Sequence, residues 1–124
     1  MAAVRKNLTG ETNGTFNGIF AGEDFAIQDT INKGDGTAQD IAGWSLRFRI
    51  YEALGQNLPP LLEKTTAAGG IVLTDPTHGL CTITGVEADT QDIAPGYYPY
   101  TLWRVDSGAT NELSYGLIQI GPND

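Results

Sequence analysis

Residues 44–51 of the chain read Trp-Ser-Leu-Arg-Phe-Arg-Ile-Tyr. Large apolar side chains stand at every second position, namely at Trp44, Leu46, Phe48 and Ile50. A period of two is that of a β-strand with one buried face, whereas a helix would spread the same side chains around its surface. The segment therefore predicts a strand that packs into a core. Arg47 and Arg49 are expected on its opposite face, toward water or a partner carboxylate.

Further strand signals flank this segment and are separated by turns rich in Gly, Asn, Asp and Pro. They cover residues 15–20, 24–31, 61–64, 71–74, 80–84, 97–105 and 112–120. Only residues 87–93 suggest a helical turn, and no amphipathic helix of 10–15 residues separates the strands, which argues against parallel βαβ units. We therefore expect an all-β, antiparallel chain that forms a sandwich or a small barrel.

The length of 124 residues is that of one domain with a single core. The first 14 residues are polar and rich in Gly, Asn and Thr, and are interpreted as an extended arm or a flexible tail. The expected organisation is therefore an N-terminal arm over residues 1–14 and a β domain over residues 15–124.

The charge balance excludes several classes of partner. Asp and Glu total 15 against 7 Lys and Arg, a formal net charge of −8. Binding to nucleic acid or to anionic lipid needs a basic face that this composition cannot readily supply. No apolar run approaches the roughly 20 residues of a membrane span, and the N-terminus does not resemble a signal peptide. We expect neither nucleic acid nor membrane as a partner.

Candidate chemical groups are few. The only histidine, His78, lies in a predicted turn, and the only cysteine, Cys81, lies in a strand where it is expected to be a core thiol. One His and one Cys cannot make a zinc site alone, and the turn around Asp35 lacks the ligand pattern of a calcium loop. An enzyme would need a cleft that holds His78 with Cys81 or a carboxylate. We expect no catalysis, no metal and no cofactor.

Aromatic side chains give the positive signal. In the predicted strand over residues 97–105, Tyr98, Tyr100 and Leu102 should face the core, which leaves Tyr97 and Trp103 on the opposite side. Together with Arg47 and Arg49, these two residues are the candidate partner contacts. An alternative is a carbohydrate-binding module, which would present Tyr97 and Trp103 as an exposed flat row.

An ordered set of short motifs runs from about residue 20 to residue 120. In chain order they are Gly22-Glu23-Asp24-Phe25, Asp40-Ile41-Ala42-Gly43-Trp44-Ser45-Leu46-Arg47-Phe48, Gly70-Ile71-Val72-Leu73-Thr74-Asp75 with Gly79, Asp89-Thr90, Ile93-Ala94-Pro95-Gly96-Tyr97-Tyr98-Pro99-Tyr100-Thr101-Leu102, and Asp106-Ser107-Gly108. This set resembles the immunoglobulin-like domain of tailed-phage virion proteins, and is similar to the N-terminal domain of phage baseplate upper proteins.

The resemblance implies an antiparallel immunoglobulin-like β-sandwich of about seven to nine strands with an extended N-terminal arm. It carries over no catalytic residue. It implies a structural protein of the virion, assembled in the host bacterial cytoplasm, whose partners are other tail, baseplate or capsid subunits and further copies of itself. Baseplate upper proteins continue beyond this domain, whereas the sequence stops at Asp124, so we expect an accessory or capsid-decorating subunit as well as a baseplate component. The arm is expected to become ordered on assembly.

Overall fold

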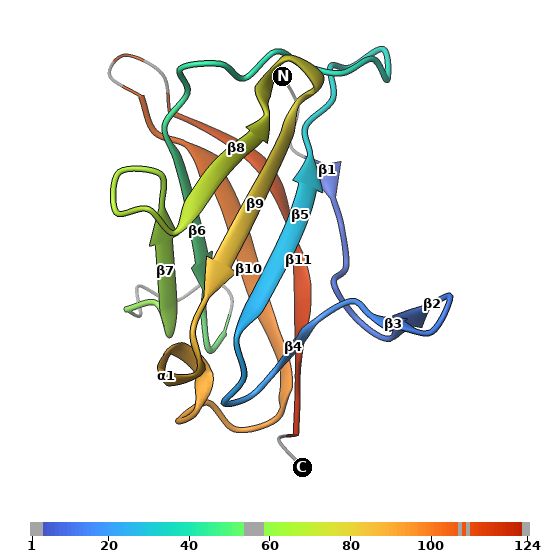
Figure 1. Cartoon of the computed structure of the whole chain (residues 1–124), viewed down its shortest axis with the longest axis vertical. Helices are drawn as coiled ribbons and strands as arrows, with labels where there is room; N and C mark the ends of the chain where they lie inside the picture. The colour runs from blue at the N-terminus through green and yellow to red at the C-terminus, as the bar shows by residue number, and fades with distance from the viewer. Residues whose placement is uncertain (1–3, 54–58, 107, 109, 123–124) are drawn as a thin grey trace.

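A computed structural model describes residues 4–53, 59–106, 108 and 110–122 (Figure 1). The short strands are β1 (Val4–Arg5), β2 (Glu11–Thr12), β3 (Thr15–Phe16) and β4 (Ile19–Phe20). The longer ones are β5 (Phe25–Thr30), β6 (Leu46–Ile50), β7 (Leu62–Thr65), β8 (Ile71–Asp75), β9 (Leu80–Gly85), β10 (Gly96–Arg104) and β11 (Asn111–Gly121). Helical structure in these residues is limited to the 3₁₀ turn η1 (Pro76–His78) and the single turn α1 (Glu87–Thr90).

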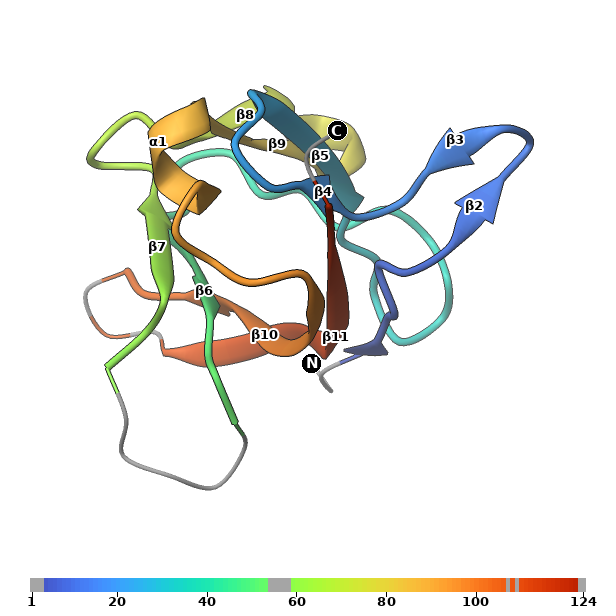
Figure 2. The same ribbon diagram turned by 90° about the horizontal axis from the view of Figure 1, so that it is seen from below.

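The strands form two main sheets that pack face to face, as Figure 2 shows from below. The larger sheet has the order β1-β11-β10-β6-β7, and β4 also pairs with β11. The smaller sheet has the order β5-β9-β8. All pairs of the longer strands are antiparallel, whereas β1 and β4 run parallel to β11. The prediction of an all-β, mainly antiparallel protein is therefore confirmed.

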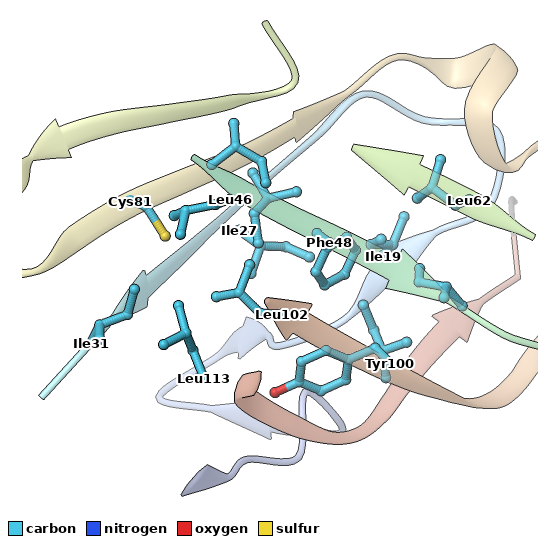
Figure 3. Close-up of a cluster of buried hydrophobic side chains, with 14 of the residues drawn as sticks. Ile19, Ile27, Ile31, Leu46, Phe48, Leu62, Cys81, Tyr100, Leu102 and Leu113 are labelled. Carbon is cyan, nitrogen blue, oxygen red and sulfur yellow. The ribbon is translucent and has the colours of Figure 1, made fainter. Parts of the chain in front are cut away.

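The alternation that predicted β6 is present in the structure. Leu46, Phe48 and Ile50 are fully buried, and the intervening arginines are only partly buried. On the neighbouring strand β10, Tyr100 and Leu102 point into the same core (Figure 3). The Phe48 and Tyr100 rings lie 5.6 Å apart between centroids, within the range where aromatic pairs add to packing.

Trp44 lies at the rim of this core. It precedes β6, is partly buried and packs against the core cluster. The guanidinium carbon of Arg104 lies 4.0 Å from the centre of a Trp44 ring, a cation–π contact that covers the indole. Trp44 was predicted to point into the core, but it is only partly buried at the edge of the core.

The smaller sheet contributes the opposite wall of the core. Ile27 on β5, Ile71 on β8, and Cys81 and Ile83 on β9 are buried. The prediction of a core thiol is confirmed for Cys81, which is fully buried. Burial, together with the charge of Asp29 on the adjacent strand, raises the pKa of the Cys81 thiol to about 12.

The N-terminal segment lies along β11 of the same chain. Lys6 N–H donates to the Tyr115 carbonyl at 2.8 Å and Leu8 N–H donates to the Leu117 carbonyl at 2.8 Å. A Cβ at Gly116 would lie 2.0 Å from the Lys6 carbonyl oxygen, so only glycine allows this approach. The structure thus differs from the expectation of an arm that is ordered only on assembly, because its hydrogen bonds are made within one chain.

A polar cluster ties this segment to both sheets. The Lys6 ammonium contacts the Asp29 carboxylate of β5 at 2.5 Å and donates to the Thr30 carbonyl at 2.7 Å. The Ser114 hydroxyl of β11 donates to the other Asp29 oxygen at 3.2 Å. Lys6 therefore bridges the gap between the larger and the smaller sheet on this side of the sandwich.

Residues 11–16, which include the end of the predicted arm, form a projecting hairpin. Strands β2 and β3 pair with each other and extend away from both sheets (Figures 1 and 2). The hairpin ends at Phe16, and the chain continues into β4. The Phe16 ring stacks on the Phe20 ring of β4 with 4.5 Å between centroids. The boundary predicted between residues 14 and 15 falls at the turn of this hairpin.

Candidate interaction surface

The four predicted contact residues lie on the side of the larger sheet that faces away from β5, β9 and β8, here called the outer face. Strand pairing sets Trp103 of β10 opposite Arg47 of β6, and Thr101 opposite Arg49. Because side chains at directly paired positions share a face, Trp103 and the two arginines come together. Tyr97 lies on the same face farther along β10.

Arg49 is already engaged within the chain. Its guanidinium forms an ion pair with Glu63, which the β6–β7 register places directly opposite. The Tyr51 hydroxyl lies 3.4 Å from Arg49 Nη1, and this contact, together with Glu63, raises the pKa of the guanidinium above its usual value. The pair reduces the net charge that Arg49 offers to a partner.

Arg47 differs from Arg49 in its surroundings. Its Nε atom is buried and has no hydrogen-bond partner among the described residues. The same holds for the Thr101 hydroxyl oxygen on β10. Buried polar atoms are nearly always paired with protein or water. Both atoms lie beneath the surface of the outer face, so a docking partner could reach them only after the surrounding side chains move.

Tyr97 and Trp103 are separated by most of the strand. Trp103 follows Tyr97 six residues later on β10, which corresponds to roughly 20 Å at about 3.3 Å per residue. Tyr97 is 62% exposed, whereas Trp103 is partly buried. Pro99 and Thr101 lie between them on this face, so the two rings do not form one continuous aromatic row.

Two further exposed residues occupy the same face on β11. Tyr115 pairs with Thr101 and is 40% exposed, and Leu117 pairs with Pro99 and is 36% exposed. Neither residue was among the predicted partner contacts. A signal was present, because buried Ile118 and Ile120 set the phase of β11 and assign the odd-numbered positions 115 and 117 to the outer face.

A groove of about 560 Å³ runs beside these residues. Its lining includes Tyr115, Leu117 and Thr101, with Arg5 and Glu112 as its charged groups. The outer face thus combines exposed aromatic and aliphatic area with a few polar groups, which is the composition of a protein–protein contact surface.

The enzyme hypothesis required His78 to meet Cys81 or a carboxylate in a cleft. His78 meets Asp75, with Nδ1 3.0 Å from the carboxylate, but on an exposed turn where 75% of the imidazole is accessible. Cys81 instead faces the core, and its raised pKa keeps the thiol protonated.

In the part of the chain that the structure describes, no group of three His, Cys, Asp or Glu residues could hold a metal ion. None of the helices in that part is long and apolar enough to cross a membrane.

Comparison with known proteins gives likenesses among solved structures alone. No family model matches the chain, and no curated protein sequence matches it. Among solved structures, the N-terminal domain of phage TP901-1 ORF48 is similar to the chain with a TM-score of 0.46 and 13% sequence identity. The superposition covers 99% of this chain and 86% of that one.

Proposed function

We propose that the chain is a non-enzymatic structural subunit of a tailed-phage virion, in the tail, the baseplate or on the capsid surface. It would act through protein–protein contacts, as one of several copies in a symmetric particle. The observation that carries the proposal is the ordered motif set between residues 20 and 120. Apart from Ser107, which lies outside the described residues, its motifs fall on turns and strands of the sandwich, and no cluster of reactive side chains is found on them there.

The motif before β6 illustrates this role. The Asp40 carboxylate accepts a hydrogen bond from Ala42 N–H at 2.9 Å, and Gly43 has a positive φ of 79°. This turn ends at Trp44 and starts the strand. The Pro95-Gly96 motif likewise introduces β10, whose first residue is Gly96. A motif set of this kind specifies a rigid scaffold.

We further propose that the sandwich is immunoglobulin-like. In that fold, strands B, E and D lie in one sheet, and strands G, F, C and C′ lie in the other. The order β5-β9-β8 opposite β11-β10-β6-β7 matches this arrangement, strand for strand along the chain. The disulfide of antibody domains has no counterpart, because the sequence contains one cysteine.

The outer face is the proposed contact surface. Tyr97, Tyr115 and Leu117 supply the exposed apolar area, and Arg47 supplies a partly exposed cation opposite Trp103. Aromatic residues and Arg dominate the energetics of protein interfaces. The net charge of −8 favours neighbouring subunits with a basic surface.

The test is incorporation into particles. The chain, carrying an affinity tag, is expressed during growth of the phage that encodes it, and particles are banded on a density gradient. The wild-type chain should band with the particles. The double variant Tyr97→Asp, Leu117→Lys should stay at the top of the gradient, because two charges would be buried in the contact.

The matched control is Val72→Asp on β8. Val72 is 50% exposed and belongs to the smaller sheet, so this variant should still band with the particles. A wild-type chain that never bands with particles would contradict the structural role. The carbohydrate-binding alternative predicts instead that the wild-type chain binds a glycan array and that Tyr97→Asp abolishes this binding.

A further inference from the structure

We propose that the free edge of β5 accepts an extended, basic segment of a partner protein as an additional β-strand. This docking site lies on the side of the sandwich, away from the outer face. It is independent of the function proposed above, and it is built from the main chain of β5, the β2–β3 hairpin and the N-terminal segment.

The backbone direction along β5 follows from two observed hydrogen bonds. Ile31 N–H donates to the Gly79 carbonyl at 2.8 Å, toward β9. The Thr30 carbonyl faces the other way, because it accepts a hydrogen bond from Lys6 at 2.7 Å. Since N–H and C=O groups alternate in direction along a strand, those of Ala26 and Gln28 also point away from β9.

No strand in the described part of the chain pairs with this side of β5. The smaller sheet has the order β5-β9-β8, so β5 is a terminal strand. Ala26 and Gln28 are exposed. Their main-chain groups form a row of unpaired donors and acceptors, which is a template for another strand.

The other sheet edges carry features that discourage such pairing. On β8 the pairing register is irregular between Val72 and Asp75, and Pro59 and Pro60 precede β7 closely. On β11 the edge is covered by β1 and β4. Bulges, prolines and covering segments are the usual protections of an edge. Among the longer strands, β5 alone has a regular edge without them.

Two grooves follow the first part of this edge, from Phe25 to Gln28. A groove of about 570 Å³ is lined by Ala26, Ile27 and Gln28 on one side and by Leu8 and Phe16 on the other. A second groove, of about 400 Å³, continues past Ala26 and Phe16 toward Glu23 and Asp24. The Lys6–Asp29 ion pair closes the opposite end. The accessible edge therefore suits a short extended segment rather than a helix or a globular surface.

The chemistry of the grooves specifies the occupant. Leu8 and Phe16 are partly buried and offer an apolar subsite, and Ile27 lies beneath. Glu23 and Asp24 are exposed at the second groove, whereas Lys6, the cation beside β5, is already paired with Asp29. A segment with alternating apolar residues and a Lys or Arg toward Glu23 is complementary to both features.

The first experiment is a selection with a library of random nine-residue peptides displayed on a carrier protein, panned on the full chain. We expect enrichment of sequences with alternating apolar positions and a basic residue at one end. Two variants, Gln28→Pro and Gln28→Thr, test whether the peptide pairs with the main chain of β5. Proline removes the outward N–H of residue 28 and is tolerated on an edge strand, whereas threonine keeps that N–H and favours a strand.

The best enriched peptide is then synthesised and titrated. Affinity should be kept within about threefold in Gln28→Thr and fall at least tenfold in Gln28→Pro, with both variants showing the wild-type melting temperature. Hydrogen exchange at the Ala26 and Gln28 amides should slow at least tenfold in the complex. Glu23→Gln should weaken binding by about threefold at low salt, and the difference should shrink as salt screens it.

Three results would overturn the proposal. These are selection of no peptide, selection that Gln28→Pro leaves unchanged, and equal binding of a peptide in which the basic residues are replaced by Glu. The other possible occupant of the edge is a second copy of the chain, and sedimentation of the chain alone tests it by measuring the oligomeric state. A dimer that dissociates in Gln28→Pro would mean that a second copy, and not a basic partner segment, occupies the edge.

Discussion

The hydroxyl of Tyr100 donates a hydrogen bond of 2.8 Å to the main-chain carbonyl of Lys6. Tyr100 is 2% exposed and stands at the centre of β10, so the N-terminal segment is fastened to the core of the sandwich. Burial and the nearby Asp29 charge raise the pKa of the Tyr100 phenol. The hydroxyl therefore remains a donor across the physiological pH range.

Tyr100→Phe tests this connection. The ring contact with Phe48 is retained, but the Lys6 carbonyl loses its buried donor, and the free energy of unfolding should fall by about 1 kcal/mol. Urea denaturation measures the loss, and hydrogen exchange at Leu8 N–H should become faster. Unchanged exchange at Leu8 would show that the strand pairing with β11 alone holds the segment.

Gly116→Ala tests the close approach of the segment to β11. The new Cβ would lie 2.0 Å from the Lys6 carbonyl oxygen, and the φ of 157° disfavours a side chain. We expect the segment to leave β11, with loss of exchange protection at Lys6 and Leu8 and a destabilisation of about 1–3 kcal/mol. Gly34→Ala is the matched control, because a Cβ there meets nothing within 4 Å. Equal stability of the two variants would contradict the prediction.

Asp106 should contribute to the acid sensitivity of the fold. Its carboxylate accepts hydrogen bonds from Ser45 N–H and from Arg104 Nε, the latter at 3.0 Å. The Ser45 bond is the main reason why the pKa of Asp106 lies below its usual value of 3.8. A lowered folded-state pKa gives stability that is present above the unfolded-state value and is lost as the pH falls through the folded-state value.

The measurement is urea unfolding between about pH 2 and pH 6, in wild type and in Asp106→Asn. As the pH is lowered below about 4, the free energy of unfolding should fall more steeply in wild type than in Asp106→Asn. Asp92→Asn, on an exposed turn, is the control and should keep the wild-type slope. Parallel curves for wild type and Asp106→Asn would show that other carboxylates dominate the acid response.

Cys81 should be unreactive in the folded protein. Its thiol is buried, and its pKa of about 12 leaves little thiolate at pH 8. We expect a disulfide reagent to label it only as fast as the chain unfolds, and within seconds in concentrated guanidinium chloride. Stoichiometric labelling within seconds in native buffer would place the thiol at the surface.

The sequence predicted the strands and turns that are determined by residues close together in the chain. Alternation identified β6 and the inward residues of β10 and β9, because one buried face imposes a period of two. The Pro and Gly positions located the turns, because the backbone preferences of these two residues favour turn conformations. Alternation also assigned Arg47 and Trp103 to the faces of their strands that point away from the core.

Features that depend on register between distant segments were not predictable. The ion pair between Arg49 and Glu63 needs β7 beside β6 at one particular alignment. The position of Trp103 opposite Arg47 likewise needs β10 beside β6 at one particular alignment. Pairing of the first residues with β11 rests on contacts formed only in the folded chain.

The parallel pairing of β1 and β4 with β11 has a mechanical consequence. In Figure 1, β1 lies near one end of the sandwich and β11 finishes at the other. A tensile load that pulls these two ends apart slides the strands past each other, so the bonds from Lys6, Leu8 and Gln119 bear force together instead of rupturing one by one. The arrangement therefore predicts that the chain resists stretching along its long axis more strongly than an arrangement in which these bonds break in sequence.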